Sequence, residues 1–529
     1  MLDLKEKETS KEATILLKYK NNIKKADATK FIKGQNIQSE LVLKDDKENG
    51  NVYADEKDLV RIIKPDQTSR NFKTMQSAIL NVQSDTQTGT YTIKILEDYT
   101  LTDSDINELG NFSRSGVDFI ITGANENTKS NVALKINASI MLSTDTVFKD
   151  IVLDYGTSNS HGIYARGHKL EMGQNISMKG TGSPILIGGE NGKDVSKSEI
   201  IVRSGTYSAI YGGGYEERSG VHGNVTITLY NGEVIGDIYA GSQNTGLIST
   251  GTTNINLIGG TVRGLVCGTS KVLGLENSNN VNIHLQGTNL KEVYGGYVES
   301  RENNDDTGLT TITVDKSCPL NKLVGFTKLY INNGVTLEVT EVLNHKGGIR
   351  VLDESGEICF NGNSKLIVPP SYYASDRQAG WLKSNGQGNE VVVYKDKYLS
   401  LTSEREDEIG NNKIILNLKN KQTSKESSIL LKYENNPQKA DKTKFEKGEN
   451  ILSELVLKGD KVVGNVYADE KDLVKITKPH KESIEFKTMQ SAIQSIQSDD
   501  QVGTYTITLL EDYILTDSDI SALSNFNRS

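Results

Sequence analysis

The chain has 529 residues, a formal net charge of −9, and 49 glycines against 7 prolines, a balance that favours a long all-β chain with many tight turns. The acidic balance, without a dense Lys/Arg cluster, argues against nucleic acid as a partner. No apolar run approaches the roughly 20 residues needed to cross a bilayer as a helix, so no membrane insertion is expected. The three cysteines are far apart and indicate neither a disulfide framework nor a metal site; Cys267, among apolar strand residues, is expected to be buried.

A long internal repeat dominates the sequence. Residues 7–115 recur at 421–529 with a constant offset of 414, and 77 of the 109 positions are identical. Such a period indicates tandem duplication in an array protein. Because the similarity extends back to residues 2–4 and 416–418, we expect the chain to be an excerpt from a longer repeating protein.

The first predicted element is a small β domain over residues 1–64. Its second copy, at 396–478, contains short alternating strands separated by charged turns, which is typical of a sandwich-like linker domain. The first copy has no equivalent of residues 398–413, so it is expected to be truncated at its start.

Residues 65–345 are predicted to form a parallel β-helix that begins with a helix near 72–83. Phe72, Met75, Ile79 and Val82 fall on one helical face. A helix there would cover the open end of the first turn, which otherwise presents unpaired backbone groups. An alternating strand over residues 89–96 follows it.

Three apolar columns repeat at a constant spacing in the middle of this segment. Within each strand the apolar residues alternate with Thr or Asn, which is the period of a β-strand. Strands whose inner faces repeat in this way stack into a parallel β-solenoid with one continuous core. About 230 residues at about 28 per turn predict roughly eight turns and about 40 Å of stack. The columns are Val225/Thr253/Val281, Ile227/Ile255/Ile283 and Leu229/Leu257/Leu285.

Two resemblances support this interpretation. From the helix onward, roughly residues 66–345 resemble the pectin-lyase-like superfamily of right-handed β-helices in pattern, which implies a right-handed parallel β-helix with an N-terminal capping helix. The motifs IYGGGY (210–215), IYAGS (238–242) and VYGGY (293–297) resemble repetitive β-helical adhesin-like surface proteins of Gram-positive, clostridial-type bacteria. This second resemblance implies a secreted, cell-surface protein and brings no defined catalytic site.

The remaining segments follow from the repeat. Residues 346–395 are predicted to form irregular turns that close the solenoid, residues 396–478 the second linker domain, and residues 479–529 the truncated start of a second β-helix. The apolar face of Phe486, Met489, Ile493 and Ile496 is expected to lack most of its cover there, because few turns follow it.

Three acidic pairs are the catalytic candidates that a polysaccharide lyase or hydrolase would need. Asp150 and Asp154 alternate with apolar residues on a strand, whereas the other two pairs lie in polar turns; all are expected to be solvated, and no catalytic residue is assigned. The turn pairs are Glu216/Glu217 and Asp305/Asp306.

No metal site is assigned. The six histidines are scattered without ligand spacing. The acids of the TDSDI segment at 102–106 could hold Ca²⁺, but the pattern reads better as a helix N-cap. No cofactor is therefore expected.

Tyrosines mark equivalent corners of successive turns. Tyr211, Tyr239 and Tyr294, with Cys267 in the fourth position, predict either a stabilising aromatic ladder or a platform for sugar rings. Tyr215 and Tyr297, in the adjacent Gly-rich loops, are the ligand-binding candidates.

The sequence therefore predicts a non-catalytic stalk or adhesin of the bacterial cell surface, with a glycan or protein of a host or neighbouring cell as its partner. Two alternatives remain open. One is a glycan-binding or glycan-degrading β-helix. The other is an extracellular filament subunit that associates head to tail, the incomplete end of one chain completing that of the next.

Overall fold

The structure is a computed structural model in which an all-β chain forms a parallel β-solenoid of about 11 turns, with four short α-helices among the described residues. It describes the whole chain except residues 6–13, 21–25, 38, 46–49, 55–56, 124–130, 216–218, 244–250, 272–279, 297–307, 346–355, 371–377, 423–426, 435, 460 and 528–529. Two compact units are present, residues 1–251 with 258–264 and 270–275, and residues 252–257 with 265–269 and 276–529.

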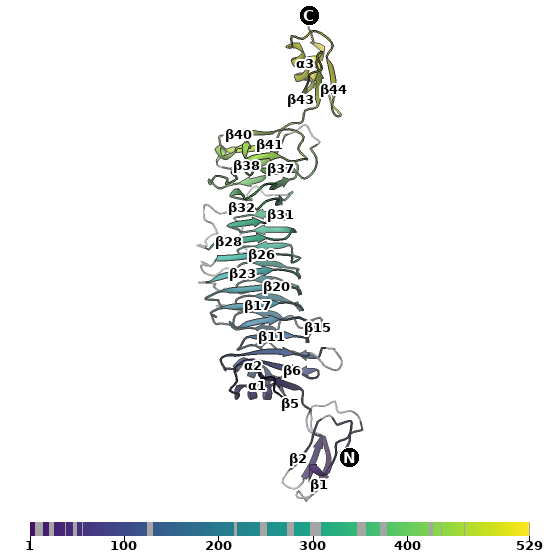
Figure 1. Ribbon diagram of the computed structural model, residues 1–529, viewed down its shortest axis with the longest axis vertical. Helices are drawn as coiled ribbons and strands as arrows, with labels where there is room; N and C mark the ends of the chain where they lie inside the picture. The colour runs from purple at the N-terminus through teal and green to yellow at the C-terminus, as the bar shows by residue number, and fades with distance from the viewer. Residues whose placement is uncertain are drawn as a thin grey trace. The chain divides into compact units, whose positions relative to one another are not determined.

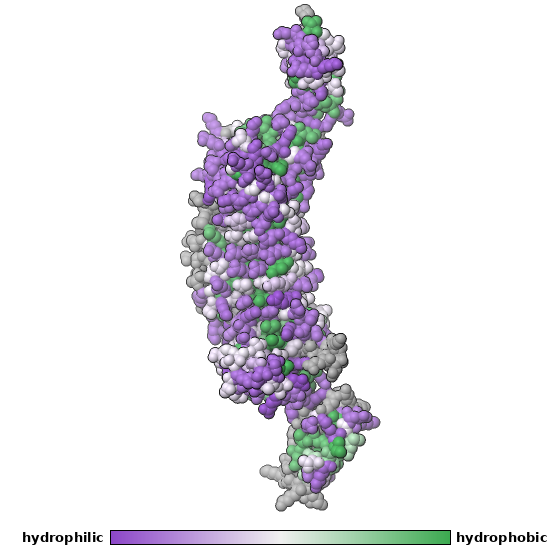
Figure 2. All heavy atoms as spheres, viewed as in Figure 1, coloured by the Kyte–Doolittle hydropathy of each residue, from purple (hydrophilic) through white to green (hydrophobic). Residues whose placement is uncertain are grey.

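The first unit begins with a three-stranded antiparallel sheet. Its central strand is β3 (Gly50–Ala54), which pairs with β1 (Thr14–Tyr19) on one edge and β2 (Leu41–Asp45) on the other. Several large apolar side chains of this region are exposed, including Ile15 and Ile32. Figure 2 shows hydrophobic atoms gathered on the visible face of this sheet.

The solenoid starts with a hairpin and a helix. Strands β4 (Val60–Ile63) and β5 (Ser69–Phe72) pair antiparallel, and α1 (Met75–Gln83) follows. The helix begins three residues later than predicted, because the Thr74 side chain accepts from the Ser77 amide and so forms the N-cap, while Phe72 ends β5. The predicted burial of Met75, Ile79 and Val82 is confirmed.

Next come β6 (Gly89–Ile95), β7 (Tyr99–Thr100) and α2 (Asp103–Asn111). Figure 1 shows α1 and α2 beside β6 at the purple end of the stack. Strand β6 pairs antiparallel with β4 on one edge and parallel with β8 on the other, so it is the strand at which the parallel stack begins.

Two long sheets and two short ones form the walls of the solenoid. The first long sheet has, in order among the described residues, β5, β4, β6, β8 (Val117–Thr122), β11 (Thr146–Lys149), β14 (Lys169–Met172), β17 (Ser198–Val202), β20 (Val225–Leu229), β23 (Thr252–Leu257), β26 (Asn280–Leu285), β28 (Thr310–Val314), β30 (Lys328–Ile331), β32 (Glu357–Phe360) and β34 (Trp381–Ser384).

The second long sheet has, within the same described ranges, β10 (Ile140–Met141), β13 (Gly162–Tyr164), β16 (Ile185–Ile187), β19 (Ala209–Tyr211), β22 (Ile238–Tyr239), β25 (Leu265–Cys267), β27 (Glu292–Tyr294), β29 (Cys318–Val324), β31 (Thr336–Asn344), β33 (Lys365–Ile367), β35 (Glu390–Val393), β37 (Ile414–Leu418) and β39 (Phe445–Lys447). The short sheets are β7, β9 (Ala133–Lys135), β12 (Ile151–Gly156) and β15 (Ile176–Gly180), and then β18 (Thr206–Tyr207), β21 (Glu233–Val234) and β24 (Thr261–Val262).

The predicted inner columns are confirmed. Ile227, Ile255 and Ile283 have no exposed surface. Ile283 pairs in register with Ile255 on one side and Ile312 on the other, so equivalent side chains stack along the core. Strands β23, β26 and β28 each bury alternate residues, which form one row against the next turn.

The prediction of roughly eight turns is wrong, because later turns abandon the constant spacing. Ile312 pairs with Leu329, and Ile358 pairs with Leu382, and both intervals are shorter than the one from Ile255 to Ile283. A constant period cannot find such turns. The second long sheet also continues past residue 395 into β37 and β39, strands of the segment expected to be the second linker domain.

A four-stranded sheet follows in the second unit. Its order is β36 (Leu399–Leu401), β38 (Ser428–Glu434), β41 (Val463–Ala468) and β40 (Leu455–Gly459). Strand β36 pairs parallel with β38 and has no counterpart among the described residues of the first copy. Under this sheet the Tyr433 hydroxyl donates to buried Asp407 at 2.6 Å, and the Lys439 ammonium donates to the Ser403 carbonyl at 2.6 Å.

The chain ends in a small three-stranded sheet with two helices. The sheet order is β43 (Ser483–Phe486), β42 (Val474–Thr477) and β44 (Thr506–Leu509), and the helices are α3 (Met489–Gln497) and α4 (Asp517–Ser524). The expectation of an uncovered α3 face is wrong. Met489, Ile493 and Ile496 are buried, because the hairpin of β42 and β43 supplies a local core.

Candidate functional site

The predicted tyrosine corner lies on the second long sheet. Tyr211 and Tyr239 pair in register, and their rings stack with centroids 5.7 Å apart and planes 5° apart. Tyr215 meets Tyr211 edge-on, with 5.5 Å between ring centroids. In the second unit, Cys267 pairs with Tyr294 at the equivalent position.

Glycines that follow these tyrosines allow successive corners to approach closely. The amide of Gly212 donates to the Tyr239 carbonyl at 2.8 Å, and the amide of Gly213 donates to the Gly241 carbonyl at 3.0 Å. A Cβ at Gly212 would clash with the Ala240 carbonyl oxygen. The Tyr-Gly-Gly pattern is therefore a packing requirement of the stack.

The burial of the rings distinguishes the two roles that the sequence left open. Tyr211, Tyr239 and Tyr294 are all more than 90% buried, so their faces pack inside the corner and present no open surface to a sugar. Burial also raises the pKa of the Tyr211 and Tyr294 phenols. The Tyr294 hydroxyl donates to Glu292 at 3.1 Å. This geometry favours the structural ladder.

Of the two ligand candidates, Tyr215 is half-buried against Tyr211, and Tyr297 lies outside the described residues. Cys267 is buried as predicted, with its thiol directed to the Gly296 carbonyl at 2.8 Å.

Asp154 lies on β12, but the prediction that Asp150 shares this strand is wrong, because Asp150 lies between β11 and β12 with a positive φ of 51°. Each acid is held by its own neighbours. Asp150 accepts from the Asn175 side chain at 2.8 Å, and Asp154 accepts from the Gly156 amide at 3.0 Å. The Lys179 ammonium lies 3.6 Å from Asp154. The other predicted pairs, Glu216/Glu217 and Asp305/Asp306, lie outside the described residues.

The TDSDI segment is a helix N-cap, as the sequence indicated. The Thr102 hydroxyl accepts from the Asp105 amide, and the Asp105 carboxylate accepts from the Thr102 amide at 2.8 Å. The carboxylate also receives the Tyr99 hydroxyl and the Gln76 amide, at 2.9 and 2.7 Å. In the part of the chain that the structure describes, no cluster of three or more His, Cys, Asp or Glu side chains could hold a metal ion.

One polar hollow was not foreseen from the sequence. It has a volume of about 320 Å³ and is lined by α2 together with Met141, Arg166, Glu190 and Asn191. The Arg166 guanidinium donates to the Gly110 carbonyl at 2.8 Å and lies 3.0 Å from Glu190. Glu190 is the carboxylate of this lining and is already paired with Arg166, which does not favour acid–base chemistry in the hollow. Its residues come from four segments of the chain, which are α2, Met141, Arg166 and the pair Glu190 and Asn191, and no local pattern marks them.

The described helices are all too short and too polar to cross a membrane. Comparisons with protein families, with curated proteins and with solved structures found no match to this chain.

Proposed function

We propose that the protein is a non-catalytic structural stalk or adhesin exposed on a bacterial cell surface. The observation that carries this proposal is the stacking itself. Ile255, Ile283 and Ile312 repeat one contact from turn to turn, so most of the chain maintains a repetitive scaffold.

Polar side chains reinforce the same scaffold from outside the core. The Arg203 guanidinium donates to Glu171 at 2.7 Å across neighbouring strands. In the second unit, Asn385 donates to Asn361 at 3.1 Å, and Asn361 donates to Asn332 at 2.8 Å, which forms an asparagine ladder along one corner. Groups engaged with the adjacent turn support a structural role over a catalytic one.

The glycan-degrading alternative requires two acids that face one substrate. In the described residues, Asp150 and Asp154 are held separately by Asn175 and Lys179, and Glu190 is paired with Arg166. This arrangement supports a non-catalytic protein that takes part in binding only.

The filament alternative requires a heterologous contact, in which one surface of a chain joins a different surface of the next. The contact that repeats from Ile255 to Ile283 and Ile312 lies within one chain and needs no second copy. This favours a stalk or adhesin over a self-assembling subunit.

The proposal is tested by incubating the purified chain with pectic and host-type polysaccharides and measuring the release of reducing or unsaturated ends. The expected result is no release above a heat-unfolded control, together with saturable binding of the folded chain to immobilised glycans or cell-surface proteins. Product release that disappears in a Glu190→Gln or Asp154→Asn variant would establish the enzymatic alternative instead.

A further inference from the structure

The polar hollow beside α2 lies where one corner of the solenoid departs from the next three. The residue two positions after β13, β16, β19 and β22 is Arg166, Gly189, Gly213 and Gly241 in turn. The amide of each of the first three donates to the carbonyl of the next, at 3.2, 2.9 and 3.0 Å. Three of these four stacked positions are glycine, so the large cation at the first of them needs an explanation other than stacking.

Arg166 is held in an uncommon backbone conformation. Its φ is 54°, in the left-handed region that few residues other than glycine adopt. The guanidinium donates to the Gly110 carbonyl at 2.8 Å and lies 3.0 Å from Glu190, and these contacts fix it in the wall of the hollow. Conformations of this kind cluster at binding and catalytic sites.

A buried polar atom of the same lining lacks a partner. The side-chain oxygen of Asn191 is buried, and in the part of the chain that the structure describes it accepts no hydrogen bond. The nitrogen of the same amide donates to the Tyr164 hydroxyl at 3.4 Å. A buried acceptor without a donor costs free energy, so a ligand that donates to Asn191 would recover that cost.

Helix α2 supplies the opposite wall. Asn107 and Asn111 lie one turn apart on the helix face that lines the hollow, and both are exposed. Each amide offers two donor hydrogens and an acceptor oxygen. Ile106 and Met141 add a small apolar surface. The helix approaches Met141 closely at Gly110, where an added Cβ would lie 3.3 Å from the Met141 Cβ.

These groups define the chemistry of a ligand. Arg166 and Glu190, the charged residues of the lining, neutralise each other, and the exposed Lys193 ammonium lies 3.6 Å from the same carboxylate, so an uncharged ligand is favoured. A hydroxyl group both donates and accepts, which suits the amides, whereas C–H groups suit Ile106 and Met141. The volume of about 320 Å³ lies at the lower end of the range of about 300–1,000 Å³ for ligand pockets, which fits a single ring.

We propose that the polar hollow binds one uncharged pyranose ring of a glycan, with a sugar hydroxyl donating to Asn191 and others contacting the amides of Asn107 and Asn111. This inference rests on the proposed function and deepens it, because it gives the adhesin a site for a glycan partner.

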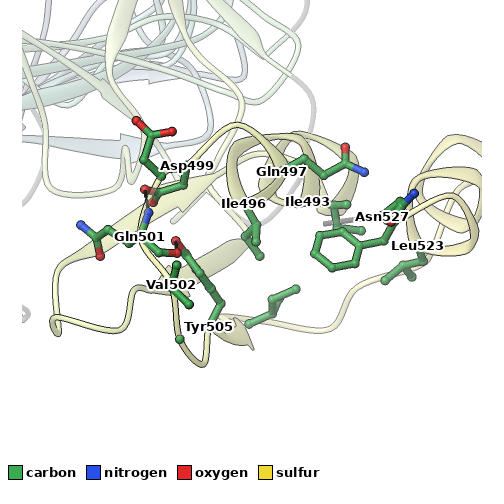
Figure 3. A pocket seen from close by; sticks show the side chains of 13 residues that line it. Ile493, Ile496, Gln497, Asp499, Gln501, Val502, Tyr505, Leu523 and Asn527 are labelled. Carbon is green, nitrogen blue, oxygen red and sulfur yellow. Dashed lines mark hydrogen bonds between the residues drawn. The ribbon is translucent and has the colours of Figure 1, made fainter. Parts of the chain in front are cut away.

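The second copy of the helix differs at this face. Asn107 and Gly110 correspond to Ser521 and Ser524 of α4. Figure 3 shows that α4 turns another side chain, Leu523, toward a hollow of its own. We therefore expect the sugar site at the first copy and not at the second.

The test titrates the full chain with free glucose, galactose, mannose and N-acetylglucosamine, and with glucuronic and galacturonic acids as charged counterparts, in saturation-transfer difference NMR. Asn191→Leu removes the unpaired acceptor at similar volume. Asn107→Ser introduces the residue of α4 into the lining. Its matched control is Glu108→Ala, which introduces Ala522 of α4 at a position outside the lining.

The expected result is saturable binding of at least one uncharged sugar to the parent chain and to Glu108→Ala. Binding to Asn191→Leu and Asn107→Ser should be at least tenfold weaker, and neither uronic acid should bind more tightly than its uncharged counterpart. The Tm of Asn191→Leu should equal or exceed that of the parent, because the oxygen that it removes has no protein partner to lose. Lost affinity at retained Tm separates a ligand contact from a structural one.

Three results would overturn the inference: no binding of any uncharged sugar, tighter binding of a uronic acid than of its uncharged counterpart, or equal affinity of the parent and Asn191→Leu. Failure of the proposed function is a different outcome. If every variant bound immobilised glycans as the parent does, the adhesin proposal would stand and the hollow would not be its site. Release of reducing or unsaturated ends by the parent would instead refute the non-catalytic function, whatever the affinities of the hollow variants.

Discussion

The substitution Ile255→Asp places a carboxyl group in the middle of the solenoid core. Ile255 has no exposed surface and stacks on Ile283. Losing the buried isoleucine costs about 1.5–3 kcal/mol. Burying an unpaired polar group adds about 2–7 kcal/mol. The total is comparable with the roughly 5–15 kcal/mol that stabilises a whole domain, so the variant should unfold far below the temperature of the parent.

The destabilisation should also depend on pH. An apolar environment raises the folded-state pKa of the introduced carboxyl above its unfolded value near 4. Below pH 4 the group is protonated in both states. Above pH 4 the introduced carboxyl group ionises in the unfolded state but stays protonated in the folded state. The free energy of unfolding therefore falls by about 1.4 kcal/mol per pH unit until the folded-state pKa is reached. The deficit in Tm should therefore be larger at pH 7 than at pH 4.

Circular dichroism during thermal unfolding at both pH values measures these effects. The matched control is Asn256→Asp, one residue along β23 on the outer face, which should change stability by less than about 0.5 kcal/mol. If Ile255→Asp unfolded within about 2 °C of the parent, or if its deficit were the same at pH 4 and pH 7, the inner column would not be the buried core described here.

Three further predictions concern groups outside that column. Burial raises the pKa of the Asp407 carboxyl, so the contribution of this group to stability falls as the pH rises above about 4. The variant Asp407→Asn should therefore lose less Tm than the parent between pH 4 and pH 7. Identical pH profiles of Tm in the two proteins would contradict this prediction. Asn361→Ala should lower the free energy of unfolding in urea by about 1–3 kcal/mol, because it removes the two hydrogen bonds that join Asn361 to Asn385 and to Asn332; no change in the urea midpoint would contradict the ladder. Tyr239→Leu should cost about 0.5–1.5 kcal/mol through lost stacking on Tyr211 while leaving glycan binding unchanged; loss of binding at full stability would favour the sugar platform.

The regular part of the fold could be predicted from the sequence. Apolar residues at a constant spacing, alternating with polar ones, predicted the inner row of the solenoid correctly. The structure buries the members of this row, Ile227, Ile255 and Ile283. The helix cap at Thr102 and Asp105 was also predictable, because capping depends on residues three positions apart.

The irregular turns could not be predicted, because their pairing depends on contacts rather than on sequence spacing. Leu329 follows its partner Ile312 after a much shorter interval than the regular turns have, so a search at one constant spacing misses it. The sequence around the asparagine ladder contains a weaker pattern that marks these irregular turns. An apolar or Ser residue precedes Asn332, Asn361 and Asn385, and a glycine follows each within two residues.

Two other features required the folded chain. The burial of α3 depends on the local hairpin of β42 and β43, whose contribution the sequence interpretation left out. The polar hollow joins Arg166 and Glu190 to α2, whose Gly110 is separated from Arg166 by 56 residues along the chain. Side chains brought together in this way leave no local pattern.

The unequal spacing of the turns has a consequence for how such a chain can change. The successive partners Ile312, Leu329, Ile358 and Leu382 are separated by unequal lengths of chain, yet all deliver an inner residue to the same stack. The connecting loops, and not the core, therefore absorb the difference in length. For a flexible loop, each doubling of length adds only about 0.6 kcal/mol to the free energy of closing it.

Insertions and deletions between strands are therefore nearly neutral for stability, whereas a single residue gained or lost within a strand would turn its apolar row outward. Variation in this protein should accumulate at the corners, and new surface features can arise there without any alteration of the core.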